Sequence, residues 1–97
     1  MALEVAMKYL EKKAHAHLVP SMQKVIEVVD KEGPLSSSEI IEKVEFSTRA
    51  VRYALKHLVE YEILEKEPYL PDMRKTMYKI SKKIEEMKAE MHRTKPL

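Results

Sequence analysis

Apolar residues recur along most of the chain at the spacings of a helix face, and one later stretch alternates instead. Spacings of three and four residues place side chains on one side of a helix, whereas alternation is typical of a strand. This pattern predicts helices that begin near residues 1, 20, 36, 48 and 81, with a two-stranded hairpin between the last two. The predicted fold is therefore mainly α with a small β-hairpin, an α+β arrangement.

Capping residues mark the ends of the second and third predicted helices. Pro20 suits the first turn of a helix, and Gly33-Pro34 suits its carboxyl end. The third helix has three candidate caps between Ser36 and Ser38, of which Ser36 has the capping-box spacing to Glu39. The apolar positions expected in these two helices are Met22, Val25, Ile26 and Val29, then Ile40, Ile41 and Val44.

The helix expected from Thr48 onward separates its apolar and cationic residues most clearly. Ser47 is a good N-cap, and Phe46 with Val51 has the spacing of a hydrophobic staple. The expected buried face is Val51, Ala54, Leu55 and Leu58, and the expected front is Arg49, Arg52, Tyr53 and Lys56. No acid occurs on this front before Glu60, whereas solvated faces usually mix both signs. A nucleic-acid contact explains such a front, and a surface helix that is merely basic is the alternative.

The predicted hairpin is acidic on one strand and basic on the other. Its strands are expected within residues 61–67 and 74–80, joined by a loop of about half a dozen residues. Thr76, Tyr78 and Ile80 would share one face of the second strand. The acids Glu65 and Glu67 could pair across the strands with Arg74, Lys75 or Lys79. Such pairing is an alternative to a nucleic-acid role for the hairpin cations.

Both terminal helices carry apolar residues in a heptad spacing, which is typical of helices that pack on other helices. The positions are Leu3, Met7, Leu10, Ala14 and His17 at one end and Ile84, Met87 and Met91 at the other. A small domain rarely needs two such helices for its own core, so Leu3, Met7, Leu10, Ile84, Met87 and Met91 are predicted to form a homodimer contact. Packing of both stripes within one chain is the alternative.

Length and composition limit what this chain can be. Its 97 residues suit one domain, with an amino-terminal helix at 1–18, a core at 20–80 and a carboxyl-terminal helix at 81–93. A net charge of +2 does not by itself indicate a nucleic-acid partner, so the location of the charge must carry that inference. We expect a cytoplasmic protein, since neither a signal peptide nor a membrane span is evident. Asn and Cys are absent, Gln and Gly occur once each, and Lys and Glu are abundant, which together favour a thermophilic source.

Neither an enzyme nor a cofactor protein is predicted. The chain has no cysteine and no glycine-rich phosphate loop, and it is short for a deep pocket. His15 and His17 point to different sides of a helix, and His57 and His92 are isolated, so histidine ligation of a metal is not expected. We therefore predict no catalytic residue, no metal and no cofactor.

Three residues separate the third predicted helix from the basic one, which is the geometry of a helix-turn-helix. With the hairpin and final helix behind it, this order resembles the small prokaryotic winged-helix regulators of the MarR and ArsR type, particularly short archaeal ones. The resemblance rests on Ser47 to Leu58, then on Ile63-Leu64 and Tyr78-Lys79-Ile80. The family often has glycine where the recognition helix ends, and Glu62 stands there in this chain, which leaves open the turn into the wing.

The resemblance implies a recognition helix in the DNA major groove, a wing at the minor groove or backbone, and a dimer on two half-sites. The DNA-binding residues it implies are Ser47, Thr48, Arg49, Arg52, Tyr53 and Lys56 in the helix and Arg74 and Lys75 in the wing. We therefore predict sequence-specific binding of double-stranded DNA by a homodimeric transcriptional regulator. A winged helix that binds proteins, or a non-specific component of a chromatin or transcription assembly, is the alternative.

Overall fold

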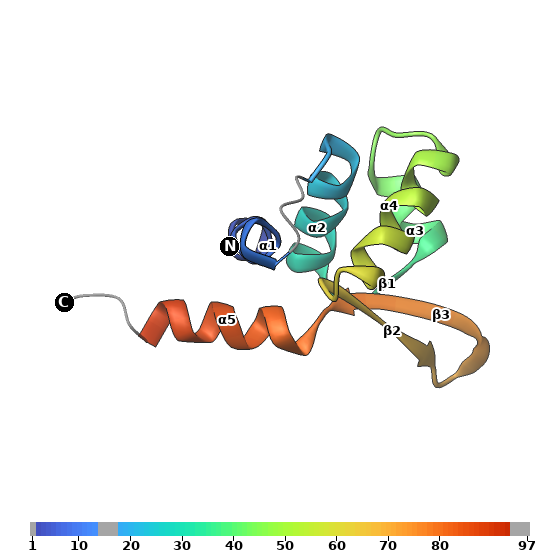
Figure 1. Ribbon diagram of the computed structural model, residues 1–97. Helices are drawn as coiled ribbons and strands as arrows, with labels where there is room; N and C mark the ends of the chain where they lie inside the picture. Colours follow the sequence, from blue (N-terminus) through green and yellow to red (C-terminus); the bar gives the residue numbers. More distant parts are fainter. Residues whose placement is uncertain (1, 14–17, 94–97) are drawn as a thin grey trace.

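The structure is a computed structural model that describes residues 2–13 and 18–93. Four helices form one layer, and a small antiparallel sheet and the final helix lie beneath it in the view of Figure 1. The helices are α1 (Ala2–Lys13), α2 (Pro20–Glu32), α3 (Ser37–Lys43), α4 (Thr48–Glu60) and α5 (Lys82–Arg93). The strands are β1 (Leu35–Ser36), β2 (Leu64–Tyr69) and β3 (Asp72–Ile80). The predicted α+β winged helix-turn-helix with two additional terminal helices is confirmed.

The caps expected for α2 and α3 are confirmed. Pro20 occupies the first turn of α2, and Gly33 ends the helix with a φ of 84°, a left-handed conformation that glycine adopts without steric cost. At the start of α3 the Glu39 N–H donates to Ser36 Oγ, while the Ser36 N–H donates to Glu39 Oε1. This capping box lowers the pKa of Glu39, first through the backbone hydrogen bond from Ser36.

The sheet differs from the predicted hairpin in two ways. It has three strands in the order β1-β3-β2, because Leu35 and Ser36 pair with Tyr78 and Met77 before α3 begins. The prediction of a connecting loop of about half a dozen residues was wrong, since β2 runs to Tyr69 and β3 starts at Asp72. Pro68 is tolerated in β2 because this is an edge strand, whose outward positions donate no ladder hydrogen bond.

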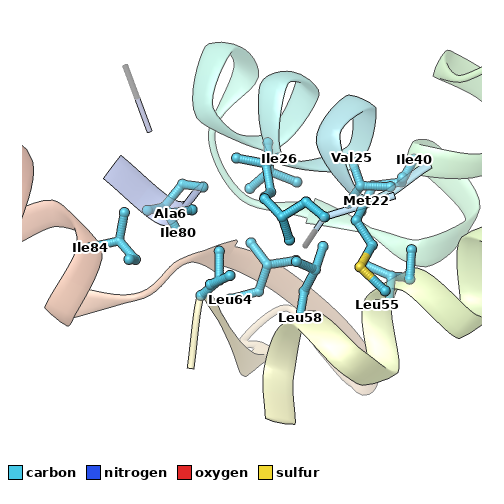
Figure 2. Packing of buried hydrophobic residues seen from close by; sticks show 14 of the residues in the cluster. Ala6, Met22, Val25, Ile26, Ile40, Leu55, Leu58, Leu64, Ile80 and Ile84 are labelled. Carbon is cyan, nitrogen blue, oxygen red and sulfur yellow. The ribbon is translucent and has the colours of Figure 1, made fainter. Parts of the chain in front are cut away.

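The core lies where α2 and α4 meet the base of the sheet. Figure 2 shows side chains from α2, α3, α4 and both long strands converging on one cluster. The four α2 residues expected on its buried face, Met22, Val25, Ile26 and Val29, are all buried. In α3, Ile40 is buried and Ile41 packs partly against the cluster, and Val44 is buried just beyond the helix. The cluster therefore fixes α4 against both the preceding helices and the wing.

The terminal helices pack on one another and on this core. In α1 the buried residues are Val5, Ala6, Tyr9 and Leu10. Leu3 is half-buried and Met7 is 39% exposed, so the buried face is rotated from the heptad stripe we expected. In α5, Ile84 is buried and Met87 is half-buried. Leu10 and Ile84 are thus covered within the chain and offer no surface to a second subunit in this arrangement.

Two lysines of α5 connect it to the rest of the domain. Lys83 Nζ lies 2.7 Å from a carboxylate oxygen of Glu62 and 3.2 Å from the Tyr9 hydroxyl. Lys88 Nζ lies 2.8 Å from Asp30 Oδ1 in α2. Both lysine pKa values lie above the usual range, that of Lys83 chiefly because of Glu62 and that of Lys88 chiefly because of Asp30. The first half of α5 is therefore linked to α1, α2 and the turn that follows α4.

Three expectations fall partly outside the described residues. The first predicted helix was to reach residue 18, but α1 is described only to Lys13, and Ala14 and His17 of the stripe lie beyond it. Met91 lies in α5, but its side chain is outside the description.

No helix within 2–13 and 18–93 is both long and apolar enough to cross a membrane.

Candidate nucleic-acid interface

The start of α4 is set by Ser47. Its side-chain oxygen accepts a hydrogen bond from the Ala50 N–H at 3.1 Å, which satisfies one of the unpaired donors of the first turn. Ser47 is therefore engaged as the cap, and Thr48 is the first helical residue. Phe46, the expected staple partner of Val51, is 37% exposed, whereas Val51 is fully buried. The cap is confirmed, and it sets the residue at which the helix begins.

The two faces of α4 are those that its sequence predicted. Val51, Ala54, Leu55 and Leu58 are buried on the inner side. Thr48, Arg49, Arg52, Tyr53 and Lys56 are exposed on the outer side. Tyr53 is 57% exposed and lies among the cations of this face. The fold thus presents a basic helix surface with one aromatic ring to solvent.

The three cations of this face have no acidic partner among residues 2–13 and 18–93. Within the described part of the chain, Arg49, Arg52 and Lys56 form no ion pair and no side-chain hydrogen bond. Glu60 follows Lys56 at helical spacing, but its carboxylate lies 3.7 Å from His57 Nδ1 instead. The positive charge of the α4 front is therefore available to an anionic partner.

An aromatic column runs beside the basic front. The ring centroids of Tyr53 and His57 are 4.2 Å apart, and those of His57 and Tyr61 are 6.1 Å apart. These residues follow one another at four-residue intervals, which places them along one line of the helix. The contact with His57 restricts the ring of Tyr53 on the outer face.

The turn from α4 into the wing keeps the glycine-type geometry without glycine. Glu62 has a φ of 63°, and its N–H donates to the Val59 carbonyl. The Ile63 N–H donates to the Leu58 carbonyl, and both of these side chains are buried. This pair of hydrogen bonds with a left-handed residue between them is a Schellman motif. Glu62 therefore carries strain that glycine would avoid.

The wing cations are mostly engaged within the wing. Lys79 Nζ lies 3.1 Å from Glu67 and 4.0 Å from Glu65, which confirms the cross-strand pairing expected for Lys79. Arg74, another of the candidate partners, lies instead beside Asp72, with 3.4 Å between its Nε and Asp72 Oδ1. Lys75 forms no ion pair with the β2 acids but lies 5.6 Å from the ring centroid of Tyr69. Its charge also contributes to the lowered pKa of Glu39.

The acidic strand β2 is likewise engaged within the protein. Glu65 and Glu67 flank Lys79, and Glu65 also accepts a hydrogen bond from the backbone N–H of Lys82 at 2.9 Å. An unpaired acidic strand would favour a protein partner over DNA, because it would repel the phosphates. Since these carboxylates serve the sheet and the start of α5, that feature carries less weight.

A hollow separates the recognition helix from the wing. Its volume is about 470 Å³. It is lined by Ser37, Arg52, Leu55, Lys56, Val59, Glu60, Lys66 and Tyr78. Lys66 was absent from the predicted interface, although strand alternation puts it on the opposite face of β2 from Glu65 and Glu67. This alternation is the sequence signal from which Lys66 could have been predicted.

The structure thus brings Arg52 and Lys56 together with the base of the wing but leaves Arg74 and Lys75 at the far end of the hairpin. Arg49 and Tyr53 lie on the outer face of α4, apart from the residues that line the hollow. In the described residues no group of three or more His, Cys, Asp or Glu side chains is arranged to hold a metal ion. The groups that this surface offers to a partner are cations, hydroxyl groups and one exposed aromatic ring.

A helix-turn-helix with a basic second helix, followed by a β-hairpin, defines the winged-helix class of DNA-binding domains. The chain belongs to the family of winged helix DNA-binding domains, whose sequence model matches residues 18–83. No curated protein matches the chain in sequence.

Solved structures of other proteins, among them MarR and a probable transcriptional regulator, share this fold. A cysteine-to-serine mutant of MarR from E. coli, complexed with operator DNA, is 16% identical with a TM-score of 0.64, covering 95% of this chain and 64% of that one. A probable transcriptional regulator from Pseudomonas aeruginosa is 11% identical with a TM-score of 0.65, covering 84% and 62%. YusO from Bacillus subtilis is 23% identical with a TM-score of 0.63, covering 95% and 69%. The chain thus spans less than two thirds of the first two proteins.

Proposed function

We propose that this protein binds double-stranded DNA with sequence preference and regulates transcription as a homodimer in the cytoplasm. The single observation that carries the proposal is the front of α4, where Arg49, Arg52 and Lys56 are exposed and have no acid among the described residues. Their inner neighbours are buried, so the backbone that carries them is fixed. A preorganised cationic helix of this kind fits the major groove.

The positions along α4 suggest different roles for the three cations. Arg49 and Arg52 lie in its first half, and the amino-terminal part of a recognition helix reaches the base edges. Arginine can donate to both O6 and N7 of guanine, so these two residues are proposed to read bases. Lys56 lies one turn further on and borders the hollow before the wing. Its flexible ammonium suits a backbone phosphate.

Fluorescence anisotropy with a labelled random-sequence duplex tests the proposal. The unmodified protein should bind at low salt, and the triple variant Arg49→Ala, Arg52→Ala, Lys56→Ala should lose most of that affinity. The matched control is Lys8→Ala, Lys24→Ala, Lys82→Ala, which removes the same charge from exposed positions of α1, α2 and α5. If the control loses as much affinity as the α4 variant, net charge rather than α4 governs binding. Undetectable duplex binding at low salt would instead favour a protein-binding module.

The dimer is proposed to form through the terminal helices. Met7 is 39% exposed on α1, Met87 is half-buried on α5, and α5 extends past the other helices in Figure 1. Leu10 and Ile84 already serve the core of the chain, so the contact is expected to use the outward side of the pair. Sedimentation should give a dimer at tens of micromolar and a monomer for Met7→Glu, which places an unpaired charge in an apolar contact. A monomer for the unmodified protein would contradict the dimer.

A further inference from the structure

The tip of the wing is apolar, although the wing as a whole is charged. Residues 68–71 read Pro-Tyr-Leu-Pro, and all four are exposed. Leu70 is 79% exposed, the most of any large hydrophobic residue in the described chain, and its neighbour Tyr69 is 39% exposed. Single exposed leucines are common on protein surfaces. Here, however, the exposed leucine lies within an uncharged run at the end of a charged hairpin.

The hairpin holds this tip in a defined position. Strands β2 and β3 pair regularly from Leu64 with Ile80 to Pro68 with Thr76, and after a shift of register Tyr69 pairs with Asp72 and closes the tip. Pro68 and Pro71 fix their own φ angles on either side of Leu70, which reduces the entropy that Leu70 loses on binding. Figure 1 shows the hairpin projecting beyond the helices, on the opposite side from α5. Leu70 is therefore presented between two prolines at the end of a projecting hairpin.

Cations flank the tip on β3. Arg74 has a side chain that is 93% exposed, with Asp72 at 3.4 Å, and Lys75 lies beside the ring of Tyr69. An apolar point with positive charge behind it complements the minor groove of DNA, where base pairs are bordered by two rows of phosphates. A protein groove would bind the apolar point equally well, but it would not in general supply that double row of negative charge.

The hairpin also faces the same hollow as the recognition helix. Lys66 and Tyr78 of the wing line it together with Arg52 and Lys56 of α4. A duplex whose major groove lies on α4 would therefore also lie against the base of the wing. This continuity with the basic face of α4 favours DNA as the occupant.

We propose that Leu70 is a wedge that enters the minor groove, partly separates two stacked base pairs and kinks the duplex. The proposal rests on the DNA binding inferred above and adds DNA bending to it. Leucine is among the side chains that minor-groove proteins insert in this way, with kinks of about 20–90°. Arg74, whose side chain is 93% exposed despite its contact with Asp72, and Lys75 contact the neighbouring phosphates while Leu70 enters.

Energy transfer between dyes on the two ends of a duplex of about 30 base pairs measures the bend. Binding of the unmodified protein should raise the transfer efficiency. Leu70→Ala should still bind, because the α4 cations are untouched, but should lose that rise. Leu70→Met is the matched control and should keep it, since methionine is also used as a wedge. Because Leu70 is exposed, neither substitution should affect folding.

A second readout uses a duplex with one central mismatch, where separating the bases costs less. The unmodified protein should bind this duplex several-fold more tightly than the matched one, and Leu70→Ala should bind both alike. Binding without any bend, or a bend that persists in Leu70→Ala, would overturn the wedge and leave the proposed function intact. Loss of all duplex binding at low salt would overturn both, and the tip would then be a candidate protein contact.

Discussion

The recognition helix and the wing are both rich in cations, yet they use them differently. On α4, Arg49, Arg52 and Lys56 have no acid among the described residues. On the wing, Lys79 lies between Glu65 and Glu67, and Arg74 lies beside Asp72. The number of cations in an element therefore does not say how much charge it offers to a partner. The neighbours that the fold places beside each cation decide that.

The difference follows from the geometry of the two elements. In the hairpin, strand pairing places Glu65 opposite Lys79 and Glu67 opposite Met77, so both acids flank the same ammonium. On α4, neighbours three and four residues apart share a face, and Arg49 to Lys56 contains no acid. Glu60 is the first acid within reach, and it lies near His57. The cations of α4 therefore remain available to a partner, whereas part of the positive charge of the wing is neutralised by acids of the wing itself.

The largest expected effect concerns the buried face of α4, which supports the exposed basic face of the same helix. Leu55→Ala should lower the free energy of unfolding by about 2–5 kcal/mol, because truncation of a packed leucine leaves a cavity. Val59→Ala on the same helix is the control, and its half-buried side chain should cost about 1 kcal/mol or less. Denaturant titration measures both. Equal costs for the two variants would show that α4 is not fixed by this face.

The next largest effect tests the roles proposed for the two arginines on the exposed face of α4. Arg49→Ala or Arg52→Ala should each weaken binding to a preferred duplex by about 1–3 kcal/mol and relax the preference at one position of each half-site. Selection of bound sequences from a random pool, repeated with each variant, measures that preference. A sequence profile identical to that of the unmodified protein would assign these arginines to the backbone rather than to bases.

A smaller effect is expected at the turn that joins the two regions. Glu62→Gly and Glu62→Ala both remove the ion pair with Lys83, but only alanine keeps a side chain at a positive φ. The glycine variant should therefore be more stable than the alanine variant by about 1 kcal/mol. Urea midpoints of the two proteins provide the comparison, in which the ion pair cancels. Identical midpoints would show that the turn is not strained.

The sequence was sufficient for α2, α3 and α4 because several local signals agreed for each helix. Pro20 and Gly33 mark the two ends of α2. The capping box of Ser36 and Glu39 starts α3, and Ser47 starts α4. Capping depends on contacts within one turn, so it can be predicted without the tertiary structure. The two faces of α4 followed from the same periodicity. Since the interface is one of these faces, its helix residues could be named from sequence.

The sequence was insufficient where distant segments meet. β1 has only two residues, Leu35 and Ser36, and its strand character exists through pairing with β3. Pro68 suggested a loop, but the edge position of β2 allows it to remain in the strand. Lys66 was missed because its relation to Arg52 depends on how the wing packs beside α4. In α1, the small Ala6 and the aromatic Tyr9 moved the buried face away from Met7.

The contrast between helix and wing is tested most directly by the salt dependence of duplex binding for Lys56→Ala and Lys79→Ala. If each subunit neutralises about four phosphates, the log affinity of a dimer should fall with log salt at a slope of roughly −7. Lys56→Ala removes one contact per subunit and should make the slope about 2 units less steep. Lys79→Ala should leave the slope unchanged, because Glu65 and Glu67 already neutralise that cation. Equal changes for the two variants, or a change for Lys79→Ala alone, would contradict this division of roles.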